Sequence, residues 1–225
     1  MASRLIVLSV ILAAAWAASP PVPQPKSGKV RPCYLNDYKC IADNLAANSK
    51  CNKKVVGSVP SQYTVRNQRF ETPYFNSSYV DNVLIVRNHN KCYVSEFFFN
   101  IDRDTLVLSV DCPKLDLDSN RTLIQHHSLG EDTEYNYHIR GNYPLIRMTT
   151  NLKHADKLDL CSAYVLGDVT ALPIFNIDPL DKPTANFLSH DLTFLNIYER
   201  ETFFYRARHL LRYFVNSYIC NFGCN

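Results

Sequence analysis

The sequence predicts an α+β fold in which a long antiparallel β meander curves around a long C-terminal helix, with a short helix near the N-terminal end. Three observations support this prediction. Apolar residues recur at helical spacing near both ends, the middle of the chain is rich in β-branched and aromatic residues, and eight cysteines are spread along it. A sheet wrapped on a helix is the simplest way to bury the apolar faces of both.

The first nineteen residues have the layout of a secretory signal peptide. Arg4 supplies an early positive charge, the apolar run Leu5–Ala18 contains one polar residue, and small residues close the segment. The run is shorter than the roughly 20 residues that span a bilayer, and no later segment comes close. We therefore expect cleavage near Ala17 or Ser19, and a secreted, extracellular protein that is not bound to a membrane.

Three segments are expected along the chain. They are the signal peptide over residues 1–19, a disordered proline-rich leader over residues 20–31 and a single domain over residues 32–225. The formal charge is only +3 and no dense stripe of Lys and Arg is present, so nucleic-acid binding is not expected.

The cysteines of an exported chain mature in an oxidising compartment, where disulfides form. An even number fits four bridges, and the spacings lack the paired motifs of a zinc site. The eight residues are Cys33, Cys40, Cys51, Cys92, Cys112, Cys161, Cys220 and Cys224. Spacing alone does not determine their connectivity, because eight cysteines allow 105 pairings.

The segment from Cys33 to Cys51 has helical character. Ile41, Leu45 and Ala46 share one face, and Asp37 is placed to cap the start of the helix. We expect a Cys33–Cys40 bridge to fasten the entry to this helix.

The middle of the chain predicts strands, and two of them form a hairpin that turns at Asp102. Cys92 and Cys112 are equally far from this turn, so antiparallel pairing sets them opposite each other. We expect them to form a bridge, which contributes roughly 3 kcal/mol by closing a loop of about 20 residues. The first four strands are expected at Tyr63–Phe70, Val80–Arg87, Cys92–Phe99 and Thr105–Cys112.

Three further strands are expected before a proline-rich stretch, at Thr133–Arg140, Leu145–Asn151 and Leu158–Leu166. The segment Thr184–Tyr218 then reads as one long helix. Its apolar stripe is expected to face the core, and it consists of Ala207, Leu210, Leu211, Phe214 and Tyr218. The tail cysteines that follow have Cys51 or Cys161 as available partners.

Two N-glycosylation sequons are present, at Asn76-Ser-Ser and Asn120-Arg-Thr. Each has a permitted middle residue, so we expect Asn76 and Asn120 to lie in surface loops that carry glycans.

No motif indicates catalysis, a cofactor or a metal, and we expect the protein not to be an enzyme. The pair His126-His127 fits a solvated loop, since adjacent strand residues point to opposite faces and do not chelate one ion. The acidic residues Asp111, Asp116 and Asp118 lack the glycine and terminal glutamate of an EF-hand loop.

Several extended motifs resemble the fibrohexamerin family, the small glycoproteins of the lepidopteran fibroin complex. The resemblance covers the chain from about Arg31 to Asn225. It implies non-covalent association with the disulfide-linked heavy and light fibroin chains, in the silk gland lumen, which keeps that complex soluble and transportable. The motifs are Arg31–Cys40, Ala46–Cys51, Pro73–Ser77, Asp111–Pro113, Ser119–Leu123, Tyr143–Arg147 and Asn216–Asn225.

The opening of the domain, with Cys33 and Cys40 before a helix, is more distantly similar to the juvenile-hormone-binding and takeout proteins. That resemblance implies a takeout-like fold around an apolar tunnel, and an alternative function as a carrier of a lipophilic ligand. For the fibroin-binding function, which is the leading prediction, we expect aromatic strands such as Phe97–Phe99 to cover apolar fibroin segments.

Overall fold

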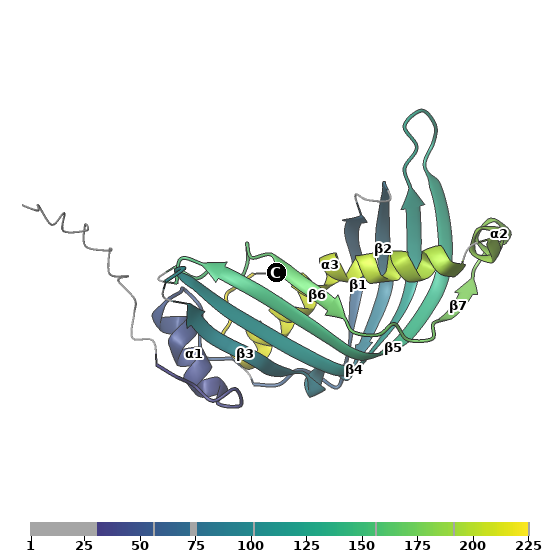
Figure 1. Ribbon diagram of the computed structural model, residues 1–225. Coiled ribbons are helices and arrows are strands. Elements are labelled where there is room, and N and C mark those ends of the chain that lie inside the picture. Colours follow the sequence, from purple (N-terminus) through teal and green to yellow (C-terminus); the bar gives the residue numbers. More distant parts are fainter. Residues whose placement is uncertain are drawn as a thin grey trace, which may run out of the picture.

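The computed structural model describes residues 31–55, 57–72, 76–100, 102–155, 157–190 and 192–224 (Figure 1). The expected signal peptide and residues 20–30 of the expected leader lie outside them. The described chain forms a seven-stranded antiparallel sheet, three α-helices and four disulfides. In chain order the elements are α1 (Tyr38–Ala47), β1 (Gln62–Thr72), β2 (Ser77–Arg87), β3 (Tyr93–Asn100), β4 (Thr105–Gln125), β5 (Thr133–Lys153), β6 (Val165–Val169), β7 (Asn176–Pro179), α2 (Lys182–His190) and α3 (Leu192–Tyr218).

The strand β4 is the centre of the sheet. It pairs with β5 along its whole length, while its other edge is divided between β3 over Thr105–Asp111 and β2 over Asp116–Gln125. β1 pairs with β2, and β6 and β7 pair with separate parts of β5. The chain therefore does not pass through the sheet strand by strand, because β2 and β3 share one edge of β4.

Strands β4 and β5 are each longer than their alternation of apolar residues predicts. The expected strand ending at Cys112 continues to Gln125, and the two strands expected over 133–151 are one strand. In both strands the set of buried residues switches from one alternate series to the other. The switch lies near Lys114 on β4 and near Pro144 on β5, which are opposite each other in the sheet. Lys114 has a φ of +52°, in the left-handed region, which interrupts the regular alternation.

Two more boundaries differ from the sequence prediction. The strand expected from Leu158 begins only at Val165, because much of the preceding segment forms turns. The short strand β7 was not expected, since Pro179 is a poor strand residue. It pairs residues 176–179 with 137–140 of β5, and proline is tolerated at the end of an edge strand.

Helices α1 and α2 begin where the side chain of an aspartate caps them. The Asp37 carboxylate accepts a hydrogen bond from the Cys40 backbone N–H at 2.9 Å, as expected, and Asp181 does the same for Thr184 at 2.7 Å. The expected helix 184–218 corresponds to α2 and α3, and residue 191 between them lies outside the described part. The predicted stripe on α3 is buried, apart from a half-buried Tyr218.

Helix α3 lies across one face of the sheet (Figure 1). Its contact with β6 requires a glycine, because a Cβ atom at Gly167 would lie 2.6 Å from the Phe203 carbonyl oxygen and 2.7 Å from the Ala207 Cβ. Buried side chains of α3, including Leu211 and Phe214, join one hydrophobic core with β4 and β5. None of the helices in the described ranges is long and apolar enough to cross a membrane.

The disulfides fall into a local and a long-range set. Cys33–Cys40 and Cys92–Cys112 close short loops, and both are pairs that were expected. Cys51–Cys220 and Cys161–Cys224 fasten the tail after α3 to the segment after α1 and to the turn before β6. The end of α3 is thus held at two points distant in sequence.

Candidate functional site

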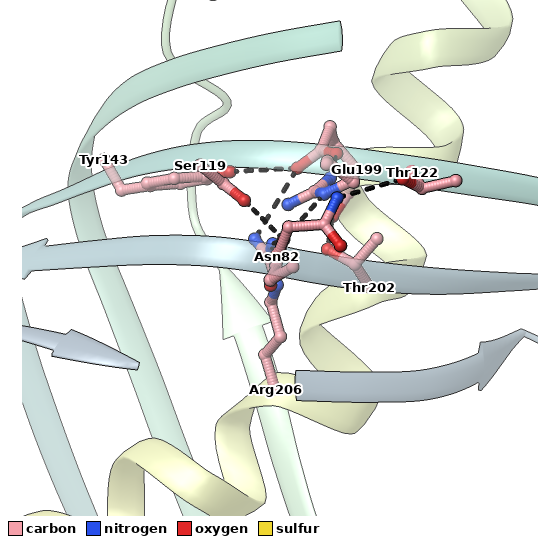
Figure 2. Close-up of polar contacts among 9 residues, drawn as sticks. Asn82, Ser119, Thr122, Tyr143, Glu199, Thr202 and Arg206 are labelled. Carbon is pink, nitrogen blue, oxygen red and sulfur yellow. Dashed lines mark hydrogen bonds and ion pairs between the residues drawn. The ribbon is translucent and has the colours of Figure 1, made fainter. Parts of the chain in front are cut away.

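Four charged side chains meet between α3 and the sheet, each exposed by 3% or less (Figure 2). Asp81 comes from β2, Arg121 from β4, and Glu199 and Arg206 from α3. We call these four residues the charge cluster. Two carboxylates and two guanidinium groups sum to zero charge, which is the condition under which buried ions are tolerated.

Asp81 is the hub of the charge cluster. Its carboxylate accepts from the Arg121 Nε at 2.9 Å, from the Arg206 Nη2 at 2.6 and 2.8 Å, and from the Ser119 hydroxyl at 2.6 Å. Arg121 also pairs with Glu199 through its Nη1. A β-bulge at Asn82 changes the alternation of β2, so that Asp81 and Leu84 both face α3.

The surroundings keep Arg121 charged. Burial alone would lower its pKa, but Glu199 and Asp81 raise the pKa of Arg121 well above its usual value. The guanidinium also lies 5.5 Å from the ring centroid of Tyr79. The charge cluster is buried, so we interpret it as the set of ion pairs that holds α3 in place on the sheet.

The acidic residues singled out in the sequence lie on the opposite face of the sheet, each beside a cation. Asp111 accepts two hydrogen bonds of 2.7 Å from Arg147, which hold the pKa of Asp111 below its usual value. Asp116 pairs with Arg140 at 2.8 Å. Asp118 accepts from Arg87 at 3.0 Å and hydrogen-bonds the His138 ring at 2.8 Å. Each of the three carboxylates therefore has an arginine partner of its own.

The two sequon asparagines are exposed but differ in setting. Asn76 lies at the β1–β2 connection, where its Nδ2 donates to the His126 carbonyl at 2.8 Å. Asn120 is in the middle of β4 rather than in a loop as expected, since β4 continues past Cys112. Thr122 of its sequon is buried, and Arg121 belongs to the charge cluster.

The neighbouring histidines have separate partners. The His126 ring contacts the Ser78 hydroxyl at 2.6 Å and Asp132 at 2.8 Å, whereas the His127 ring contacts the Thr133 hydroxyl at 3.0 Å. They lie just after β4 in a loop.

A third histidine, His89, is buried beside the Cys92–Cys112 disulfide. The three residues come close enough to hold a metal ion, but both sulfur atoms are used in the bridge. The His89 Nδ1 lies 2.8 Å from the Tyr63 hydroxyl, and the ring stacks on Tyr213. Burial lowers the pKa of His89 to about 4.

Exposed aromatic residues gather at two places. On the edge strand β3, Phe98 is 49% exposed and Tyr93 is similarly open, whereas Phe97 and Phe99 are partly buried against the core. The second place is a groove of about 800 Å³ lined by Tyr164 and by Phe204 of α3, next to the end of β1.

These features define a disulfide-bonded α+β domain whose charged centre is buried and whose exposed aromatic residues gather at the β3 edge and in the groove beside Phe204. Residues 29–224 match the family model described as Fibroin P25, and the chain belongs to this family. It is 66% identical over 200 residues to a curated protein of Galleria mellonella named Fibrohexamerin, and the match covers 89% of this chain and 92% of that protein. The resemblance found in the sequence is thereby confirmed.

One solved structure that aligns with the chain is a crystal structure of lipopolysaccharide binding protein. The alignment has 8% sequence identity and a TM-score of 0.28, and it covers 71% of this chain. This chain spans about a third of that protein, 34% of its length.

The charge cluster predicts that Asp81→Asn destabilises the fold. The substitution leaves Arg121 and Arg206 buried with less compensation, and breaking a buried ion pair costs about 3–5 kcal/mol. Urea unfolding with the disulfides intact measures the loss. Asp102→Asn, in the exposed β3–β4 turn, is the matched control and should leave the midpoint unchanged. A loss below about 1 kcal/mol for Asp81→Asn would contradict the structural role.

His89 predicts a loss of stability in acid. Its folded pKa is about 4 and that of the unfolded chain is near 6.5, so protonation favours the unfolded state as the pH falls through this window. The His89 contribution is roughly 3 kcal/mol between pH 7 and pH 4. His89→Gln should flatten the pH dependence of the unfolding free energy by about that amount, whereas His127→Gln should not. Equal slopes for wild type and His89→Gln would contradict the assignment.

Proposed function

We propose that the chain is a secreted silk-gland glycoprotein that binds non-covalently to the disulfide-linked heavy and light fibroin chains and supports the solubility, secretion and assembly of that complex. Its membership of the Fibroin P25 family carries this proposal. The 66% identity to Fibrohexamerin over nearly the whole domain supports it. The disulfides also support a non-covalent mode, because all eight cysteines pair within the chain.

Export and glycosylation belong to the proposal. Residues 1–19 act as the signal peptide, and glycans are attached at Asn76 and Asn120. Ser78 and Thr122, the hydroxyl residues of the two sequons, are buried once the domain has folded. Attachment therefore takes place before β2 and β4 pair, while the sequons are still accessible.

The intact mass of the protein from the gland lumen tests the processing. We expect a mass that matches a chain beginning near residue 18 or 20, plus two glycans that N-glycosidase removes. Asn120→Gln and Asn76→Gln should each remove one glycan. An unmodified full-length mass would contradict the export pathway, and a single glycan would show which sequon is unused.

We place the fibroin-binding surface on the free edge of β3. Among the described strands, β3 pairs only with β4, so no strand lies along its other edge. The Val94 backbone near the start of β3 hydrogen-bonds the Tyr38 side chain of α1, so we assign the added strand to the part of the edge that carries Phe98. Phe98 and Tyr93 extend this edge with apolar surface. Of the three phenylalanines expected to cover fibroin, only Phe98 is strongly exposed, so it carries the contact.

The positions of the sequons favour β3 over the groove beside Phe204. β3 pairs with the first part of β4, and this pairing ends at Asp111. Asn120 lies nine residues further along β4, so an extended strand separates it from Asp111 by up to about 30 Å. The groove, in contrast, includes Glu71, which pairs with Ser78 in the Asn76 sequon. A glycan at Asn76 would crowd the groove and leave β3 uncovered.

Phe98→Ser tests the surface. The purified chain is mixed with fibroin heavy and light chains, and the fraction that comigrates with the large complex is measured by native size separation. Wild type should comigrate. Phe98→Ser should weaken binding at least tenfold, because it removes the aromatic side chain that becomes buried in the interface with fibroin. Phe204→Ser, at the other exposed aromatic site, is the control and should bind as wild type does.

The two failures of this experiment are distinct. Absence of comigration for the correctly folded wild-type chain would contradict the fibroin partnership itself. Comigration that Phe98→Ser leaves intact, with the near-UV circular dichroism preserved, would contradict only the β3 surface.

A further inference from the structure

A cleft of about 630 Å³ separates α3 from strands β1 and β2. Its apolar lining is formed by Leu84 and Val86 of β2, Leu117 of β4 and Leu210 of α3. The volume is within the range of about 300–1,000 Å³ that holds small ligands, and apolar lining with a few polar groups is the usual composition of such sites.

The charged residues of the cleft are all basic. Arg66, Arg206 and Arg212 line it, beside His209, whose pKa is lowered by burial, and none of the described lining residues is an aspartate or glutamate. Arg206 is already paired, because its guanidinium binds Asp81 in the charge cluster. Arg212 forms no ion pair among the described residues.

Arg212 is therefore a buried cation that contacts no carboxylate among the described residues. The residue is only 8% exposed, its Nε donates to the Leu160 carbonyl at 3.2 Å, and its Nη2 is buried without a hydrogen-bond partner. A buried guanidinium with an unused donor is costly unless an anion pairs with it. Its planar arrangement of N–H groups is suited to a carboxylate.

The nearby groups leave the electrostatic environment of Arg212 positive. Burial lowers the pKa of Arg212, and the positive charge of Arg208 on the same helix lowers it further. Asp159 raises the pKa of Arg212, but its effect is the smallest of the three. Asp159 is itself engaged by the backbone N–H of Cys161 at 2.8 Å. Asp159 therefore acts on the guanidinium as a nearby opposite charge, without an ion-pair contact.

We propose that this cleft binds an amphiphilic anion whose linear apolar chain lies against the leucine-rich lining and whose terminal carboxylate pairs with Arg212. A neutral lipid would fill the apolar part and leave the guanidinium unpaired. The chain's own leader does not complement the site, since residues 20–31 carry Lys26, Lys29 and Arg31 and no acidic residue. The binding site goes beyond the proposed fibroin function and is separate from the β3 edge.

The charge requirement is tested with dodecanoic acid and dodecanol, which share a hydrocarbon chain and differ in the head group. Isothermal titration of the delipidated full chain should show saturable binding of one dodecanoate, with dodecanol at least tenfold weaker. Arg212→Gln should weaken dodecanoate binding at least tenfold and leave dodecanol unchanged. Arg208→Gln, one turn away and outside the cleft lining, is the control and should change either affinity less than twofold.

A second variant separates filling of the cleft from its charge. Val65 lines the cleft from β1 and is half-buried. A tryptophan at this position fills the cleft, and the strand tolerates it because aromatic residues are common in strands. Val65→Trp should abolish binding of both ligands. The proposal is overturned if wild type shows no saturable binding, if the alcohol binds as tightly as the acid, or if folded Arg212→Gln or Val65→Trp retains wild-type affinity for dodecanoate.

Discussion

The placement of α3 depends on four charges that are buried where the helix crosses the sheet. Asp81 forms ion pairs with both Arg121 and Arg206, and Glu199 forms a second ion pair with Arg121. Apolar packing alone tolerates small shifts of a helix along a sheet, whereas a buried ion that loses its partner is strongly destabilising. The charge cluster therefore selects one position for α3, and the cleft beside β1 and β2 exists because of that position.

The long-range disulfides act on the same helix from its other end. Cys51–Cys220 and Cys161–Cys224 hold the tail that follows α3, while Glu199 and Arg206 hold its middle. With the helix fixed at both places, one face of the sheet is covered by α3 and the opposite face carries the pairs formed by Asp111, Asp116 and Asp118. No described strand pairs with the outer edge of β3, and the proposed function assigns the fibroin contact to this edge.

Local features could be predicted from the sequence because they depend on residues close together in the chain. The Asp37 cap, the buried stripe of α3 and the Cys92–Cys112 pair across a hairpin each follow from short-range spacing. The charge cluster did not follow, since Asp81 and Arg206 are 125 residues apart and no spacing rule connects them. The one available signal was the presence of charged residues at otherwise apolar positions of β2 and α3.

The long strands were missed for a related reason. The alternation of apolar and polar residues predicts a strand only while the same alternate series stays buried. In β4 and β5 the buried series switches near Lys114 and Pro144. The same switch hid the position of Asn120, which the sequence assigned to a loop. The family could be recognised by another route, because the extended motifs that resemble the fibrohexamerin family span nearly the whole domain, and the family match bears that resemblance out.

The central claim is that the chain is a non-covalent member of a fibroin assembly. Silk gland lumen contents are separated by size without denaturant, then with denaturant alone, and then with denaturant and reductant, and this chain is followed by a specific antibody. The account predicts comigration with a very large assembly in the first condition, and release as a monomer by denaturant without reductant. A monomer in the native separation, or release that needs reductant, would contradict it.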